Sequence, residues 1–144
     1  MSDDRAPWAG FVTYDRVVVL HAEVLAAHGG MASDPHEAKG CVEGSIGSAW
    51  TAELYATDDA DENARQGLIF AGYLLYYLAK NHCFGDGNKR TALAATHEVL
   101  ACLGLTLDAT EDELVEFVLS VANGPIKGGA DVVDWIAAHL AELA

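Results

Sequence analysis

Residues 81–93 read Asn-His-Cys-Phe-Gly-Asp-Gly-Asn-Lys-Arg-Thr-Ala-Leu. The nine positions from His82 to Arg90 carry a histidine, a carboxylate, two glycines, an amide and two cations. Apolar runs with helix-like composition precede this stretch at residues 68–78 and follow it at residues 92–103. We therefore predict a polar loop, residues 82–90, held between two helices, an arrangement typical of a functional site on a scaffold.

The overall composition indicates a single folded domain. The chain has 144 residues, of which 51% are hydrophobic and 21% charged, and this excludes a disordered chain. No stretch approaches about 18 consecutive apolar residues, so we expect no membrane span. Residues 1–12 are expected to form a loosely held N-terminal arm. This segment is acidic and lacks the basic start and apolar core of a secretory signal.

The three cysteines are Cys41, Cys83 and Cys102. Their number is odd, and none of them has the C-x-x-C spacing of a metal site. We therefore expect reduced thiols and a cytoplasmic protein.

The charge is strongly negative and unevenly distributed. A net charge of -14 argues against direct nucleic-acid binding, which needs clustered Lys and Arg. Three of the eight cations, Lys80, Lys89 and Arg90, nevertheless fall within eleven residues at the polar loop. This concentration indicates an anion-binding site, although cations that merely offset nearby carboxylates would give the same pattern.

Apolar spacing and capping residues predict an all-α domain. Thr13 or Asp15 caps the first helix, Pro35 begins the second, and the segment 110–113 is a capping box. The helix after the acidic residues 58–62 is apolar nearly all round and should be the most buried. The predicted helices cover residues 13–28, 35–49, 62–81, 88–103, 110–122 and 132–143.

The segment 50–57 is too short and too aromatic to predict a helix. We expect either an extended flap over the polar loop or an ordinary connecting loop in which Trp50 and Tyr55 cover the core. On the first helix, His21 and His28 lie seven residues apart on one face. Histidines at that spacing are interpreted as solvated or capping residues rather than metal ligands.

The polar loop itself has the composition of a phosphate site. Gly85 and Gly87 permit positive φ, so that successive N–H groups can form an anion-binding nest. A helix begins near Asn88, and its free N–H groups and dipole also favour phosphate. Lys89 and Arg90 add full positive charges, and arginine can bind phosphate bidentately.

Two further loop residues suggest catalysis. Asp86 is a hard oxygen ligand that suits Mg²⁺ against phosphate oxygens. His82 is the natural general base for a hydroxyl nucleophile, because imidazoles titrate near neutral pH. These residues predict nucleotide-dependent group transfer to a hydroxyl. The alternative is a simple helix corner in which Asp86 and Asn88 cap the following helix and His82 caps the preceding one.

The pattern His82-x-Phe84-x-Asp86-Gly87-Asn88-Lys89-Arg90-Thr91-Ala92-Leu93 closely resembles the signature of the Fic/Doc superfamily, in its Doc (death-on-curing) branch. The His28-Gly29-Gly30-Met31 segment, the helix from Pro35 and the Leu-Tyr pair at 54 and 55 also match features of Doc-like proteins. The resemblance covers residues 14 to about 123.

The resemblance implies an all-α Fic/Doc-type helical bundle with the polar loop between two central helices. By analogy with the family, His82 is the general base and Asp86 holds Mg²⁺. The residues that match the phosphate-binding positions are Gly87, Asn88, Lys89 and Arg90.

Doc proteins are toxins of toxin–antitoxin systems. Their best-known activity is transfer of the γ-phosphoryl group of ATP to a threonine of elongation factor Tu, and a Phd-type antitoxin neutralises them. Fic enzymes that transfer AMP typically have Gly at the position of Lys89 and Arg at that of Leu93, so both residues favour phosphoryl transfer. AMP or other nucleotidyl transfer, and a non-catalytic Doc-like binding module, are the alternatives. The segment 33–37 has the spacing of an inhibitory motif, but Ala38 follows, so we expect inhibition in trans.

Overall fold

The computed structural model describes residues 12–30, 35–56 and 63–143, within which lie six helices and two short strands. Most of the predicted N-terminal arm, Ser33 and the acidic segment 58–62 fall outside these ranges. In chain order the elements are α1 (Tyr14–His28), α2 (Pro35–Ala56), α3 (Asn63–Asn81), α4 (Asn88–Cys102), β1 (Leu105–Leu107), α5 (Glu111–Asn123), α6 (Gly129–Ala138) and β2 (Leu140–Glu142). The predicted all-α class is confirmed, with one small two-stranded sheet in addition. None of the described helices is both long enough and apolar enough to cross a membrane.

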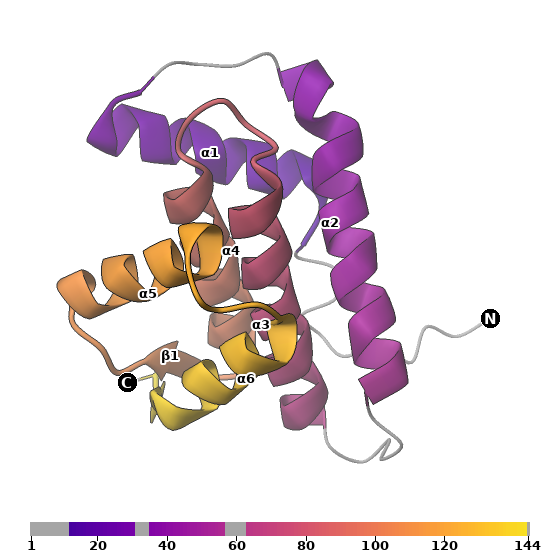
Figure 1. Cartoon of the computed structure of the whole chain (residues 1–144), viewed down its shortest axis with the longest axis vertical. Helices are drawn as coiled ribbons and strands as arrows, with labels where there is room; N and C mark the ends of the chain where they lie inside the picture. The colour runs from indigo at the N-terminus through magenta and orange to yellow at the C-terminus, as the bar shows by residue number, and fades with distance from the viewer. Residues whose placement is uncertain (1–11, 31–34, 57–62, 144) are drawn as a thin grey trace.

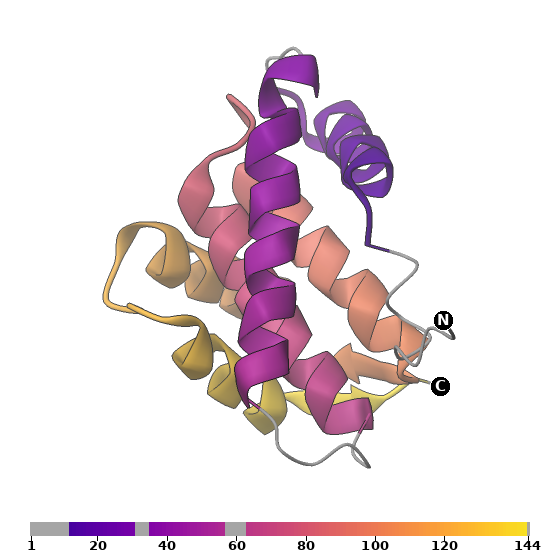
Figure 2. The same cartoon turned by 90° about the vertical axis from the view of Figure 1, so that its right-hand side faces the viewer.

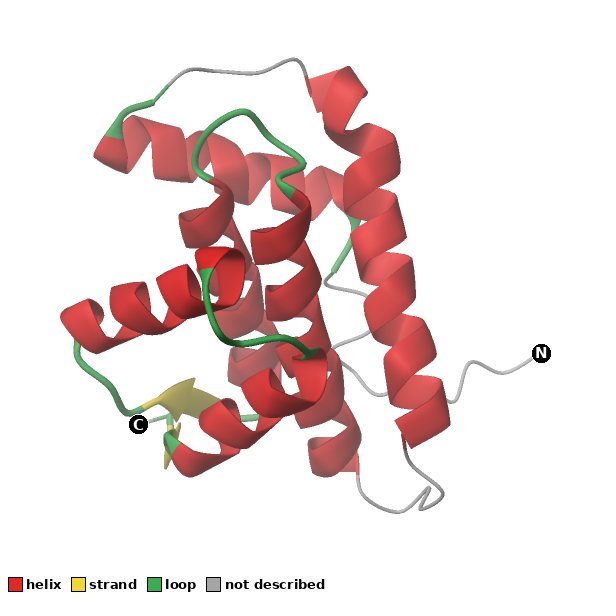
Figure 3. Ribbon diagram, viewed as in Figure 1, coloured by secondary structure: helices red, strands yellow, loops and turns green. Residues whose placement is uncertain are grey.

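Helices α3 and α4 form the centre of the domain, and the polar loop joins them at one end (Figure 1). Helix α3 contacts α2, α4, α5 and α6, whereas α1 packs on α4 close to the loop. The view in Figure 2 shows α2 running along the outside of this central pair. In Figure 3 the polar loop is the green arch in front of α1. The loop therefore lies where the central pair meets α1.

The core is centred on α3, as its sequence predicts. Phe70 and Leu74 are completely buried, and Leu75 is buried as well. At Gly72 the helix has no side chain, and α6 approaches closely: a Cβ there would lie 2.4 Å from Cγ2 of Val133 and 2.9 Å from its Cα. The absent side chain thus permits the tight packing of α6 on α3.

The predicted caps form at two of the helix starts. The Thr13 hydroxyl accepts a hydrogen bond from the Arg16 N–H at 3.2 Å and begins α1. At α5, the Thr110 hydroxyl accepts from the Glu113 N–H at 3.1 Å, while the Glu113 carboxylate accepts from the Thr110 N–H at 2.9 Å. These two bonds lower the pKa of Glu113 below its ordinary value. The capping box is therefore confirmed.

Helix α2 is longer than its sequence predicts. It continues to Ala56, so the expected flap or connecting loop over residues 50–57 is wrong for residues 50–56. The reason is packing: the Trp50 indole lies on the Phe70 ring with centroids 4.6 Å apart. Glu53, one turn further on the same face, is buried, and its burial raises the pKa of its carboxyl. Contact with α3 thus keeps this aromatic segment helical.

The C-terminal end differs from the predicted helix 132–143. Helix α6 ends at Ala138, and β2 pairs antiparallel with β1, with Thr106 opposite Ala141. The His139 carbonyl accepts from the Asp108 N–H at 2.5 Å, and the Leu143 N–H donates to the Gly104 carbonyl at 2.9 Å. A pairing between segments this far apart in sequence overrides the local helical pattern.

Candidate functional site

A pocket of about 380 Å³ lies between the C-terminal end of α1 and the start of α4. Two segments that are distant in the sequence form its walls. The residues that line it are Val24, His28, Gly29 and Gly30 on the α1 side, and Asp86, Gly87, Asn88, Lys89 and Arg90 on the α4 side. Five of the predicted site residues therefore lie together, whereas His82 and Gly85 are not among the lining residues.

The first turn of α4 gives this pocket its positive character. The first hydrogen bond of the helix runs from the Thr91 N–H to the Gly87 carbonyl at 3.0 Å, so the N–H groups of residues 88–90 have no partner within the helix. Gly87, at the N-cap with φ 77°, supplies no side-chain cap. Free amides at a helix start, with Lys89 and Arg90 beside them, favour a bound anion such as phosphate.

Asp86 projects its carboxylate into the same region. Its Oδ1 accepts a hydrogen bond from the Gly87 N–H at 2.9 Å. Its Oδ2 faces Gly30, where a Cβ would lie only 2.8 Å from this oxygen. Gly30 has φ 127°, a conformation that L side chains rarely adopt. A glycine at this position therefore leaves room for the Asp86 carboxylate at the pocket.

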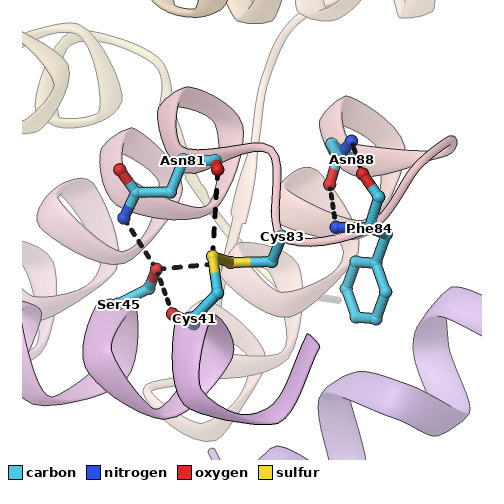
Figure 4. Close-up of a disulfide and its surroundings, with 6 residues drawn as sticks. All are labelled: Cys41, Ser45, Asn81, Cys83, Phe84 and Asn88. Atoms are coloured by element: carbon cyan, nitrogen blue, oxygen red, sulfur yellow. Dashed lines mark hydrogen bonds between the residues drawn. A yellow bond between two sulfur atoms is a disulfide. The ribbon is translucent and has the colours of Figure 1, made fainter. Parts of the chain in front are cut away.

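A side-chain clamp fixes the middle of the polar loop. The Asn88 carboxamide oxygen accepts from the Phe84 N–H at 2.9 Å, and its NH₂ group donates to the Phe84 carbonyl at 2.6 Å (Figure 4). Asn88 is buried, so these bonds satisfy both its amide and the loop backbone. The Asn88 side chain thus holds the loop backbone at Phe84, and the backbone N–H of Asn88 remains at the pocket.

Helix α1 supports the loop through a buried histidine. The Nε2 atom of His21 lies 2.7 Å from the Asp86 carbonyl, and because a carbonyl only accepts, Nε2 carries the proton. The His21 ring also stacks on Phe84, with centroids 3.9 Å apart and planes 8° from parallel. His21 is 6% exposed, so its interpretation as a solvated or capping residue is wrong. It is a buried support for the loop.

Two polar contacts hold α1 against α4. Arg90 Nη1 lies 2.9 Å from Nδ1 of His28 at the pocket edge, and because a guanidinium only donates, the nitrogen that faces it carries no proton. Further along, Arg16 Nε donates to both carboxylate oxygens of Glu98 at 3.0 Å. The hydrogen bond to Glu98 and its charge raise the pKa of Arg16. These contacts maintain the α1–α4 wall of the pocket.

His82 stands apart, at the beginning of the loop. It directly follows the last residue of α3, and its side chain is exposed. Its φ of 50° is the only positive φ at a non-glycine residue within the described ranges. This left-handed conformation ends helices but costs a residue with a Cβ about 1–2 kcal/mol. The base predicted from the sequence is thus held in an unfavourable backbone conformation.

Cys83, the next residue, forms a disulfide with Cys41 of α2. The S–S distance is 2.05 Å and the Cα atoms are 5.3 Å apart (Figure 4). The prediction of three reduced thiols is therefore wrong for two of them, and only Cys102 is free. The pair was not predictable from spacing, because the packing of α2 on α3 brings together cysteines 42 residues apart.

The donor set at the pocket fits one kind of metal ion. Within the described ranges, no group of three or more His, Cys, Asp or Glu side chains is placed to hold a metal. Among the described residues that line the pocket, Asp86 is the only carboxylate. Mg²⁺ is commonly bound through one or two carboxylates, with water and substrate phosphates as the other ligands. The pocket thus fits Mg²⁺ that arrives with a nucleotide, rather than a metal bound by protein alone.

The α1 side of the site is the part that sequence reasoning missed. His21, Val24 and Gly30 carry no signal of a site when α1 is viewed alone. The sequence marked this side of the site only through the segment 28–31, which matches a feature of Doc-like proteins. Their roles follow from the position of α1 against the loop.

The comparison with known families agrees with this geometry. The profile of the Fic/DOC family matches residues 11–100, and the chain belongs to this family. It is generally a family of enzymes that transfer nucleotide-derived groups to proteins. No curated protein matches the chain at a significant level. The matched range contains α1, α2, α3, the polar loop and most of α4.

Proposed function

We propose that the protein is a Doc-like toxin that transfers the γ-phosphoryl group of ATP to a Thr or Ser hydroxyl of a translation factor such as elongation factor Tu, and so inhibits protein synthesis. The observation that supports this most is the pocket at the start of α4. There the loop collects a carboxylate, two cations and an uncapped helix start within five consecutive residues, 86–90. This combination suits a nucleotide triphosphate bound with Mg²⁺.

In this proposal different residues of the pocket bind the phosphates and the Mg²⁺ of the nucleotide. Lys89, Arg90 and the N–H groups at residues 88–90 bind the phosphate oxygens, and Gly87, with φ 77°, lets the loop backbone approach them. Asp86 holds Mg²⁺, which supplies charge neutralisation on the phosphates. His28 contacts Arg90 and orients its guanidinium toward the pocket.

In the proposed reaction, His82 accepts the proton of the target hydroxyl. The target hydroxyl oxygen forms a bond to the γ-phosphorus, the bond from that phosphorus to the ADP oxygen breaks, and an imidazole nitrogen of His82 takes the hydroxyl proton. His82 is at one end of the loop and the phosphate pocket is at the other. The target hydroxyl must therefore reach both of them, and the exposed His82 side chain is accessible to a protein substrate.

Lys89 and Leu93 support phosphoryl transfer over AMP transfer. Beside the phosphate pocket lies a mainly apolar groove of about 180 Å³, to which both residues contribute, together with Val115 and Leu119 of α5. AMP-transferring relatives carry Gly and Arg at the positions of Lys89 and Leu93. In this chain the cation, Lys89, also lines the phosphate pocket, and the apolar Leu93 lies in the groove. The positive charge is therefore at the first of the two positions, whereas in AMP-transferring relatives it is at the second.

The proposal includes a partner and a compartment. A Phd-type antitoxin would neutralise the toxin in the cytoplasm, where elongation factor Tu is found. Expression of the chain alone should arrest growth of a bacterial host, and co-expression of the cognate antitoxin should restore it. Arrest that persists with the antitoxin, or growth unaffected by the chain and by active-site variants alike, would contradict this part of the proposal.

The reaction is tested by label transfer. Purified protein is incubated with elongation factor Tu, Mg²⁺ and ATP labelled at either the γ- or the α-phosphate. The proposal predicts label on the factor from the γ-position only, and loss of that label in His82→Ala. Label from the α-position would establish AMP transfer instead. A folded protein that transfers neither label would favour the non-catalytic module.

A further inference from the structure

The Cys41–Cys83 disulfide joins α2 to the residue next to the proposed base. Cys83 follows His82 directly, and Cys41 lies on α2, whose described side chains are not among those that line the phosphate pocket. Figure 4 shows the bond between the two cysteines. Ser45, one turn after Cys41, reinforces the junction: its hydroxyl donates to the Cys41 carbonyl at 2.9 Å and accepts from the Asn81 NH₂ group at 2.9 Å. The end of α3 and the start of the loop are thus anchored on α2.

The backbone is what fixes the direction of the His82 side chain. Among the described residues, the exposed imidazole has no hydrogen-bond partner. Its backbone has a φ of 50°, which is unfavourable for a residue with a Cβ. Such a conformation persists only where neighbouring structure imposes it. Asn81, held by Ser45, lies on one side of His82, and the cross-linked Cys83 on the other.

The rest of the loop does not depend on this cross-link. Phe84 is buried against His21, and its backbone is clamped by Asn88. His21 also donates to the Asp86 carbonyl. Cleavage of the disulfide therefore releases residues 82 and 83, while the phosphate pocket keeps its supports on α1 and α4.

The disulfide is open to exchange chemistry. Cys41 and Cys83 are both partly exposed, and we therefore expect a small thiol to reach them. Reduction by a dithiol breaks the S–S bond and gives two Cys thiols, while the dithiol loses two electrons and two protons and becomes a cyclic disulfide. The Cys41 sulfur lies 3.8 Å from the Asn81 carbonyl, so the thiol that forms there has an acceptor beside it.

We infer that the Cys41–Cys83 disulfide positions His82 for proton abstraction, so that transfer is fast in the disulfide form and slow in the dithiol form. This rests on the proposed function, and because a cytoplasm keeps most thiols reduced, the slow dithiol form is the one expected there until the protein is oxidised. The two cysteines are positioning residues, and they act on the catalytic step and not on nucleotide binding.

The test compares the two redox forms of the full chain. Thiol labelling of the unfolded, unreduced protein should detect Cys102 alone, and labelling after dithiothreitol should detect all three cysteines. In the label-transfer assay, reduction should lower kcat at least about tenfold, since misplacement of a catalytic group by about 1 Å can cost about 100-fold. The Kd for Mg·ATP, measured by calorimetry, should change less than about twofold. This is well below the change of about tenfold expected for kcat.

Variants separate positioning from a general loss of structure. Cys41→Ser and Cys83→Ser should reproduce the slow dithiol form and be insensitive to dithiothreitol, whereas the matched control Cys102→Ser should behave as wild type. His82→Ala should lower kcat strongly in the disulfide form. In the dithiol form the same substitution should lower kcat only slightly further, because His82 no longer acts as the base there. Circular dichroism at the assay temperature checks that each form is folded.

The outcomes distinguish the two proposals. Transfer with equal kcat in both redox forms, or three reactive thiols in the native protein, would overturn the positioning role and leave the proposed function standing. A His82→Ala effect of the same size in both forms would also overturn it. Absence of transfer in every form, with the protein folded, would overturn the proposed function and this inference with it.

Discussion

The two ends of the polar loop are held in different ways. At its start, His82 and Cys83 are fixed by a covalent bond to α2. At its end, the phosphate pocket is fixed by non-covalent contacts with α1, chiefly the hydrogen bond and ring stacking of His21. The proposed base and the proposed phosphate site therefore have separate supports, so each can be disturbed without the other.

The largest effect on stability is expected from breaking the covalent support. The disulfide closes a loop of 42 residues, and the chain-entropy estimate for such a loop is about 4 kcal/mol. Cys41→Ser should therefore lower the free energy of unfolding by about that amount in a urea titration under non-reducing conditions. Cys102→Ser is the control and should change it little. Equal stability of Cys41→Ser and wild type would show that the bond does not form in solution.

A smaller loss is expected from the non-covalent support. His21→Ala leaves the Asp86 carbonyl without its donor and removes the ring from Phe84, which should cost about 1–3 kcal/mol of unfolding free energy. It should also weaken Mg·ATP binding, measured by calorimetry, because the carbonyl belongs to a pocket residue. His21→Phe keeps a ring but no donor, and should recover stability in part and not affinity. Unchanged affinity in both variants would argue against this support.

Gly30 allows a more local test of the same end. In Gly30→Ala the new Cβ would crowd both the Asp86 carboxylate and the Leu25 side chain, and overpacking of this kind costs about 1–3 kcal/mol. We expect Mg·ATP affinity to fall about tenfold. Gly29→Ala is a matched control, since Gly29 also has positive φ but a Cβ there meets nothing within 4 Å. If both variants lose affinity equally, backbone strain rather than crowding of Asp86 is responsible.

The smallest effect is expected at the far end of the α1–α4 contact. The Arg16–Glu98 ion pair is partly exposed and distant from the pocket, so Arg16→Gln should lower the melting temperature only slightly and leave transfer intact. The difference from wild type should shrink further at high salt, because salt screens the pair. A large loss of transfer in Arg16→Gln would mean that the position of α1 is controlled from here and not from His21.

Much of the fold was predictable because residues close together in the sequence determine it. Thr13 and the Thr110 capping box mark helix starts by their own hydrogen bonds, and the apolar residues of α3 predict its central position. The α4 side of the pocket was predictable for the same reason, since Asp86 to Arg90 are consecutive in the chain.

What could not be predicted depends on contacts between distant segments. The Cys41–Cys83 bond needs α2 packed on α3, and the helical state of residues 50–56 needs Trp50 against Phe70. The β1–β2 pairing joins segments whose own sequences do not specify strands. His21 was misjudged because the Asp86 carbonyl that it binds is 65 residues away.

If the base and the phosphate site are separately supported parts of one transferase, calorimetric titration of Mg·ATP into wild type, His82→Ala and Arg90→Ala will distinguish them. We predict that wild type and His82→Ala bind with the same Kd, whereas Arg90→Ala binds at least about tenfold more weakly because it loses a charged phosphate contact. Loss of binding in His82→Ala, or no binding by the folded wild-type protein, would contradict the account.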